Sequence, residues 1–255
     1  MSKFLLEACV DSVSSALAAV RGGADRLELC SNLIIGGTTP DIALYKEIRK
    51  YTDTPIRVLL RPRFGDFCYD EYEYNILLEN ICMYKDAGAD GIVIGSLNPD
   101  GTLNIKQMEG MVDAAGTMGI TLHRAFDMCC DGMETLHIAK SIGVDTILSS
   151  GQESNCLKGK ELLKKMVIDA GEDMTILVGA GVSSSVIEEM YQYTGATAYH
   201  MSGKITKDSR MEFRRSSVNM GLPGISEYEI WETQEENIRK AKQVLTSCQK
   251  RERMF

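Results

Sequence analysis

The chain has 255 residues, of which 44% are hydrophobic and 25% charged, an ordinary globular composition that fits one α/β domain. Its formal net charge of −8 argues against nucleic acid as a partner, because phosphate binding needs a basic face. No apolar run reaches the roughly 18 residues of a membrane span, and Glu7 comes too early in the chain for a secretory signal.

Strand-then-helix units repeat along the chain. A glycine-containing phrase joins a helix to the next strand at 22–25, 87–90, 142–145 and 194–197, because a left-handed glycine ends a helix just before a buried strand. The predicted strands cover 5–9, 26–30, 56–61, 91–95, 121–125, 146–149, 175–179 and 198–201. The predicted helices cover 13–20, 42–50, 71–86, 105–118, 133–141, 160–170, 184–193 and 229–250.

Eight such units in about 250 residues predict a (β/α)8 TIM barrel, a single domain over 1–255. Its eight strands and first seven helices are predicted within 4–203, and its C-terminal helix covers 229–250. A doubly wound open sheet should carry GxGxxG in its first strand-to-helix turn, and that turn has no glycine. Two long connections are predicted at 31–40 and 204–228, the second carrying Arg210, Arg214 and Arg215. Loops this long at one end of a barrel usually carry function.

The first two predicted strands end in the same pattern, Glu7-x-Cys9 and Glu28-x-Cys30. On neighbouring strands this repeat predicts two carboxylates in one layer and two thiols in the next, and paired thiolates suit Cu(I). The alternative is that both cysteines are small buried hydrophobic residues. Eight cysteines without a secretory signal predict free thiols in a reducing cytoplasm, and the lack of CxxC spacing argues against structural zinc.

Charged residues gather at the ends of the third and fifth predicted strands. Arg61 and Arg63 share one face, and period-two alternation puts His123 and Asp127 on one side of their strand and Arg124 on the other. With the acids of the first two strands they could bind an anion or supply a general acid and base. The alternative is a ring of internal ion pairs that only stabilises the fold.

Glycine is frequent after the late strands. Gly179 and Gly181 follow the seventh predicted strand, and Ser202 and Gly203 follow the eighth. Backbone N–H groups in such turns bind phosphate well, and barrels often hold a phosphate at this position. The alternative is that tight turns simply need glycine. No lysine lies at these strand ends, so a Schiff-base mechanism is poorly supported.

The motifs at 6–12, 22–30, 36–40, 61–67, 123–127, 148–151, 179–182 and 200–203 resemble the CutC copper-homeostasis family, and the resemblance extends from residue 5 to about 217. It implies a cytoplasmic TIM barrel, often a homo-oligomer, that takes part in copper handling. It also implies that Cys9 and Cys30 are the Cu(I) ligands.

Two functions therefore stay open, and a non-catalytic scaffold is a third. The first is a copper-homeostasis protein with Cu(I) bound by thiols at the barrel mouth. The second is an enzyme that acts by acid–base chemistry on a small anionic or phosphorylated metabolite. Its catalytic candidates are Glu7, Glu28, His123 and Asp127, and its anion-binding candidates are Arg61, Arg63, Arg124, Gly179, Gly181, Ser202 and Gly203.

Overall fold

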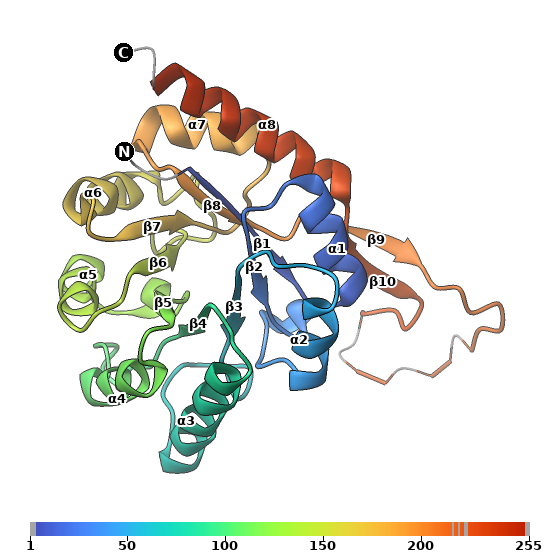
Figure 1. Ribbon diagram of the computed structural model, residues 1–255, viewed down its shortest axis with the longest axis horizontal. Helices are drawn as coiled ribbons and strands as arrows, with labels where there is room; N and C mark the ends of the chain where they lie inside the picture. Colours follow the sequence, from blue (N-terminus) through green and yellow to red (C-terminus); the bar gives the residue numbers. More distant parts are fainter. Residues whose placement is uncertain (1–3, 216, 219, 222–223, 253–255) are drawn as a thin grey trace.

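Within residues 4–215, 217–218, 220–221 and 224–252, which the computed structural model describes, eight parallel strands close into a barrel in sequence order (Figure 1). The barrel strands β1–β8 are Leu5–Val10, Arg26–Leu29, Ile56–Leu59, Gly91–Ile94, Gly119–Leu122, Thr146–Ser149, Thr175–Val178 and Ala198–Met201. The ends of the predicted domain, 1–3 and 253–255, lie outside the described residues, as do positions 216, 219 and 222–223 of the predicted connection.

The helices α1–α8 are Val13–Gly22, Ile42–Arg49, Glu71–Asp86, Ile105–Ala115, Gly132–Ser141, Lys160–Ala170, Ser184–Thr194 and Glu235–Glu252. They alternate with the strands and surround the barrel, so the predicted (β/α)8 fold is confirmed (Figure 1). Side chains cap several helix starts; Asp70, for example, forms a reciprocal capping box with Glu73 at α3. None of the helices within the described residues is long and apolar enough to cross a bilayer.

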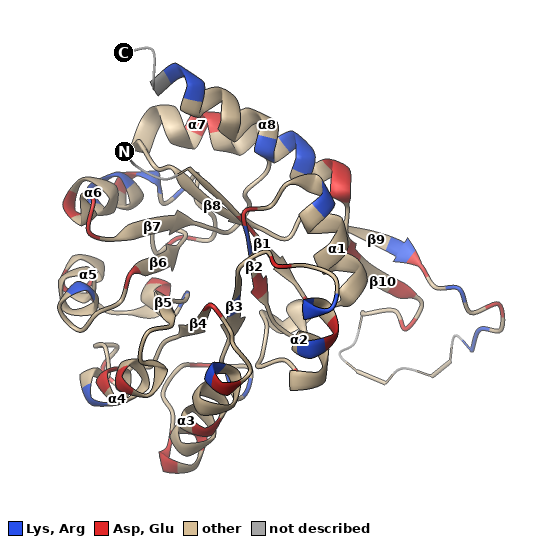
Figure 2. Cartoon of the chain, in the orientation of Figure 1, with Lys and Arg blue, Asp and Glu red and all other residues tan. Residues whose placement is uncertain are grey.

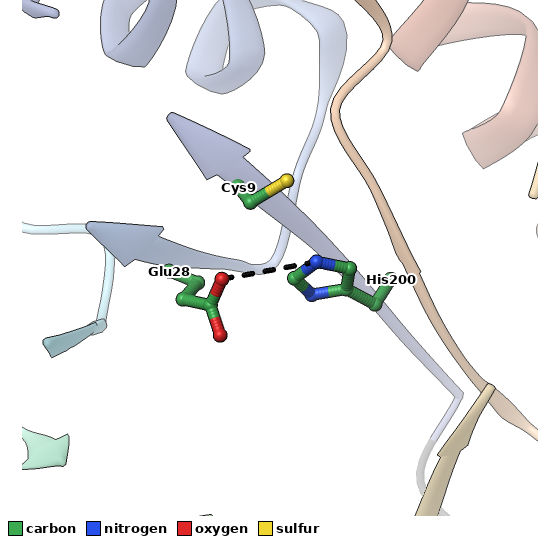
Figure 3. Close-up of side chains that lie close together, drawn as sticks. All are labelled: Cys9, Glu28 and His200. Carbon is green, nitrogen blue, oxygen red and sulfur yellow. Dashed lines mark ion pairs between the residues drawn. The ribbon is translucent and has the colours of Figure 1, made fainter. Parts of the chain in front are cut away.

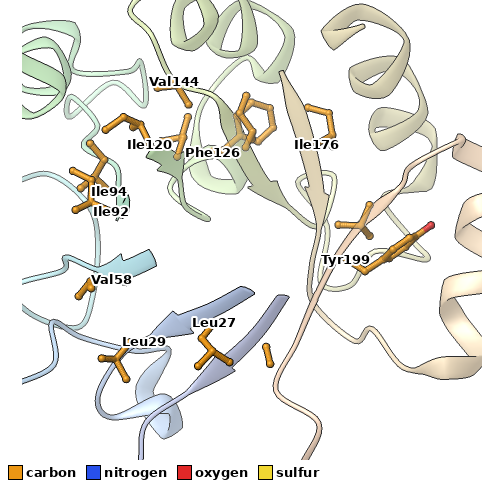
Figure 4. Packing of buried hydrophobic residues seen from close by; sticks show 14 of the residues in the cluster. Leu27, Leu29, Val58, Ile92, Ile94, Ile120, Phe126, Val144, Ile176 and Tyr199 are labelled. Carbon is orange, nitrogen blue, oxygen red and sulfur yellow. The ribbon is translucent and has the colours of Figure 1, made fainter. Parts of the chain in front are cut away.

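The main hydrophobic core lies between the strands and the helices. Outward-facing strand residues such as Leu27, Val58 and Ile92 pack there, and Figure 4 shows them as a ring around the barrel. A smaller apolar cluster of Leu5, Leu148, Leu177 and Ala198 is separate from that core. Charged residues are found mostly on the outer helices and loops, as along α8 (Figure 2). The charged residues at the ends of the barrel strands are exceptions to this outer distribution, and their positions need an explanation.

The fifth strand is shorter than predicted. β5 ends at Leu122, Ala125 has right-handed helical backbone angles, and Phe126–Met128 forms a single 3-10 turn, η2. The predicted alternation of side chains from His123 to Asp127 is therefore wrong, because period-two alternation holds only for extended backbone.

The start of the last predicted helix is also wrong. Glu229–Thr233 forms a strand, β10, which pairs antiparallel with β9, Lys204–Asp208, and α8 begins only at Glu235. This two-stranded ribbon projects from the barrel beside α1 (Figure 1). The Thr233 N–H donates to Ser15 Oγ of α1 at 3.1 Å and so fastens the base of the ribbon to the barrel.

Candidate metal centre at the barrel mouth

The pairing of β1 with β2 decides which side chains meet at the mouth. Cys9 is level with Glu28, and Glu7 is level with Arg26, so the two Glu-x-Cys motifs are offset by two residues. The predicted layer of two level thiols is therefore wrong. The physical reason is closure, because strands of a barrel must tilt and stagger relative to one another.

Strand β8 closes the barrel against β1 and brings His200 level with Glu7. His200 Nδ1 lies 2.8 Å from Glu7 Oε1, and Arg26 Nε donates to Glu7 Oε2 at 2.5 Å. The Glu7 carboxylate is fully buried, so both of its oxygens bind a cationic or polar group instead of water.

Cys9, Glu28 and His200 form a group of possible metal ligands (Figure 3). One atom from each, Sγ, a carboxylate oxygen and a ring nitrogen, lies within 4.8 Å of the other two. His200 Nε2 is 3.8 Å from Glu28 Oε2. Metal–ligand bonds of about 2.0–2.3 Å place two tetrahedral ligands roughly 3.5 Å apart, so a small inward adjustment fits an ion.

Electrostatic interactions shift the pKa values of Glu28 and His200 and of the neighbouring Glu7. Burial alone would raise the pKa of Glu7, but Arg26 and His200 lower it to about 2. Burial raises the pKa of Glu28 to about 7, although the charge of His200 opposes the rise. Burial would lower the pKa of His200, yet Cys9 and Glu28 raise it well above its usual value. His200 is thus held as a cation between acidic partners, where a metal cation could replace its proton.

Cys30 does not belong to this group of donor atoms. It is fully buried, packs with Leu59 and Val93, and its thiol donates to the Val10 carbonyl at 3.6 Å. Burial, followed by the nearby Cys9 sulfur, raises the pKa of the Cys30 thiol well above its usual value. These surroundings favour a neutral thiol with a packing role.

The three predicted anion-binding arginines do not form one clamp. Arg61 donates to backbone carbonyls of neighbouring loops, including Gly65 O at 2.6 Å. Arg63 forms ion pairs with Glu73 and Asp66. Arg124 Nε lies 2.7 Å from Asp127 Oδ2. Each guanidinium therefore binds groups near the loop that carries it.

Asp127 organises the loop after β6. Its carboxylate accepts hydrogen bonds from Ser149 Oγ at 2.6 Å, from the backbone N–H and hydroxyl of Ser150, and from the Gln152 N–H. These bonds account for an acid whose side chain is only 6% exposed. The structure thus gives this predicted catalytic residue a structural role.

The predicted phosphate-binding residues after β7 and β8 have different surroundings: some line a small surface cavity, and others have structural roles. Ser202 and Gly203 line a cavity of about 260 Å³ together with Ser183 and Lys204, at the N-terminus of α7. Gly179 has a packing role, because a Cβ there would lie 2.6 Å from Leu148 Cδ1. Gly181 has a φ of +79°, which accounts for a glycine in that turn without a ligand.

Sequence reasoning missed His200 as a candidate ligand. It lies in the last barrel strand, and in the sequence it stands out only within the motif at 200–203 that resembles the CutC family. The available signal was the predicted barrel itself, since closure makes the eighth strand a neighbour of the first.

The fold and the mouth cluster define the chain as a TIM-barrel protein in which a buried thiol, a buried carboxylate and a largely buried imidazole could together hold a metal ion. The chain belongs to the CutC family, whose sequence model matches residues 4–205. The predicted family is thereby confirmed.

Individual relatives agree with this assignment. A human protein named copper homeostasis protein cutC homolog is 38% identical over 237 residues, covering 92% of this chain and 87% of the human one. The family protein CutC of Pasteurella multocida is 36% identical and covers 93% of this chain and 97% of its own.

Solved structures give the same result at the level of the fold. The CutC crystal structure from Streptococcus agalactiae has a TM-score of 0.74 and 27% identity, covering 78% of this chain and 99% of that one. A thiamine phosphate pyrophosphorylase from Pyrococcus furiosus, at a TM-score of 0.57 and 14% identity over 96% of each chain, shares the fold alone.

Proposed function

We propose that this CutC-family chain acts in copper homeostasis by binding Cu(I) through Cys9 and His200, with Glu28 as a third ligand. The observation that carries the proposal is the gathering of their donor atoms within 4.8 Å at the barrel mouth. A thiolate and an imidazole are ligands that Cu(I) accepts. The human relative's name, which refers to copper homeostasis, supports the same metal.

Glu7 would orient the histidine ligand. It binds His200 through Nδ1 at 2.8 Å, and this leaves Nε2 directed toward Glu28. A carboxylate that holds the second nitrogen of a metal-binding histidine fixes the ring and strengthens the ligand. Arg26, which donates to the other Glu7 oxygen, would hold that carboxylate in place.

The decisive experiment compares the two thiols. Cu(I) affinity is measured without oxygen by competition with a chromophoric Cu(I) chelator for wild type, Cys9→Ser and Cys30→Ser. We expect Cys9→Ser to weaken binding by at least about 100-fold, because a first ligand matters more than the roughly 10–100-fold of an outer partner. Cys30→Ser is the matched control, since its thiol is buried beside the group but is not one of its donors.

Two results would contradict this assignment. Unchanged affinity in Cys9→Ser would exclude the site. An equal loss in Cys9→Ser and Cys30→Ser would instead favour the thiol pair that the sequence predicts.

We also propose a reducing cytoplasm as the location. All eight cysteines lie within the described residues and are free thiols, which is usual in that compartment.

The homo-oligomer that the resemblance implies stays a prediction. The acid–base enzyme has less support, because Arg61, Arg63 and Arg124 bind separate sets of protein groups and do not form one clamp for its substrate.

A further inference from the structure

A second buried polar group lies on the other strands of the mouth. Arg61 follows β3, Tyr69 lies in the loop after it, and His123 follows β5. Their exposed fractions are 8%, 6% and 4%. Among the described residues, Arg61 Nε, Tyr69 Oη and His123 Nε2 are buried atoms with no hydrogen-bond partner. Such atoms are rare in folded proteins, because each loses its bonds to water on folding.

The aromatic ring of Phe67 joins this group. The Arg61 guanidinium carbon lies 4.8 Å from the centre of the Phe67 ring, and the His123 ring centre lies 4.8 Å from the same point. The Arg61 charge is also close enough to affect the pKa values of both Tyr69 and His123. The unpartnered atoms therefore belong to one neighbourhood.

All three unpartnered atoms can donate a hydrogen bond. His123 Nδ1 accepts from the Ala125 N–H at 3.1 Å, so the proton of the neutral ring lies on Nε2. Arg61 Nε–H is always a donor, and the Tyr69 hydroxyl can donate as well. Three donors together call for a ligand that is rich in acceptor oxygens.

The charge of Arg61 specifies the ligand further. No carboxylate of the described residues lies within ion-pair distance of this guanidinium, and it donates hydrogen bonds to backbone carbonyls, Gly36 O, Gly37 O and Gly65 O. A buried cation without a counter-ion is costly. Since the neighbouring His123 ring is neutral, one negative charge would balance the group.

We propose that Arg61, Tyr69 and His123 bind the carboxylate of a small organic monoanion at the barrel mouth. A carboxylate offers about four acceptor positions for the three donors and carries the single charge that Arg61 lacks. The site stands on β3 and β5 and shares no residue with the copper ligands of β1, β2 and β8. It is therefore independent of the proposed copper function.

The test uses acetate as the probe, with sodium chloride replacing it at equal ionic strength. Apparent affinity is taken from the rise of the thermal unfolding midpoint with acetate concentration. Tyr69→Phe removes the hydroxyl and leaves the Arg61 and His123 donors in place. Tyr72→Phe, on the exposed face of α3 with 78% of the residue accessible, is the matched control.

We expect acetate to stabilise wild type and Tyr72→Phe alike, and to bind Tyr69→Phe about tenfold more weakly. The Nε2–H resonance of His123 should shift on acetate addition, and Cys9→Ser should bind acetate as wild type does. The proposal fails if acetate acts no more strongly than chloride, if Tyr69→Phe matches wild type, or if inorganic phosphate binds more tightly than acetate. Loss of acetate binding in Cys9→Ser would also overturn it, by moving the anion to the metal centre.

Discussion

Replacing His123 with asparagine is expected to change how the stability of the barrel responds to acid. Burial, aided by the Arg61 charge, lowers the pKa of His123 to about 3 from a usual value of 6.5. As the pH falls below about 6.5, His123 binds a proton in the unfolded chain. In the folded protein the same ring stays neutral until about pH 3. The contribution of His123 to wild-type stability should therefore fall by roughly 1.4 kcal/mol per pH unit in that window, or by about 2 kcal/mol between pH 7.5 and 5.

Glu28 acts in the opposite direction over the same range. Its pKa is raised to about 7, so the folded side chain binds a proton before the unfolded one does. Its contribution to stability is complete below about pH 4.5 and is lost as the pH rises through about 7. The wild-type curve mixes His123 with Glu28 and with His200, whose pKa is also shifted, whereas the difference between wild type and His123→Asn isolates His123.

The assay is urea unfolding of wild type and His123→Asn at several pH values from about 7.5 to 5. Asparagine cannot titrate, and its amide oxygen can still accept from the Ala125 N–H that His123 Nδ1 now binds. His137→Asn removes a histidine whose side chain is 61% exposed and is the matched control. Parallel curves for wild type and His123→Asn would refute the reasoning.

Three substitutions test the packing and pairing around the mouth and the helix ends. Glu7→Ala should lower the free energy of unfolding by about 3–5 kcal/mol, because it leaves the Arg26 guanidinium buried without its carboxylate; a urea midpoint like that of wild type would contradict this. Gly95→Ala should cost about 1–3 kcal/mol, since its Cβ would lie 2.6 Å from His123 Cε1, and the same assay should show it. Asp70→Ala removes the capping box of α3 and should cost about 1 kcal/mol, measured by thermal unfolding, with no shift in the midpoint as the opposing result.

The strands and helices of the barrel were predictable because their signals are local. A glycine such as Gly23, with a φ of +93°, ends a helix, and the next strand begins within a few residues of it. The location of the mouth residues was predictable from the fold, since the C-terminal ends of barrel strands share one rim. Cys9 and Glu28 lie near the C-terminal ends of β1 and β2, and Arg61 and His123 follow β3 and β5.

What could not be predicted depends on pairing between distant segments. The register that sets Cys9 level with Glu28 follows from the stagger of the closed barrel, and the matching Glu-x-Cys motifs suggest another alignment. The ribbon was missed because β9 and β10 pair across an intervening loop. Its β-forming residues Ile230 and Trp231 were a usable signal, but the mixed charges around them also fit an outer helix.

The candidate metal centre lies where the barrel closes on itself, and this position has a thermodynamic consequence. Glu7 and His200 are separated by 193 residues in the sequence, yet they meet because β8 pairs with β1. The donor group of Cys9, Glu28 and His200 therefore exists only in a chain whose first and last barrel strands are joined. Any ion that binds all three donors must stabilise the closed barrel over the unfolded chain, so metal affinity and barrel closure are linked.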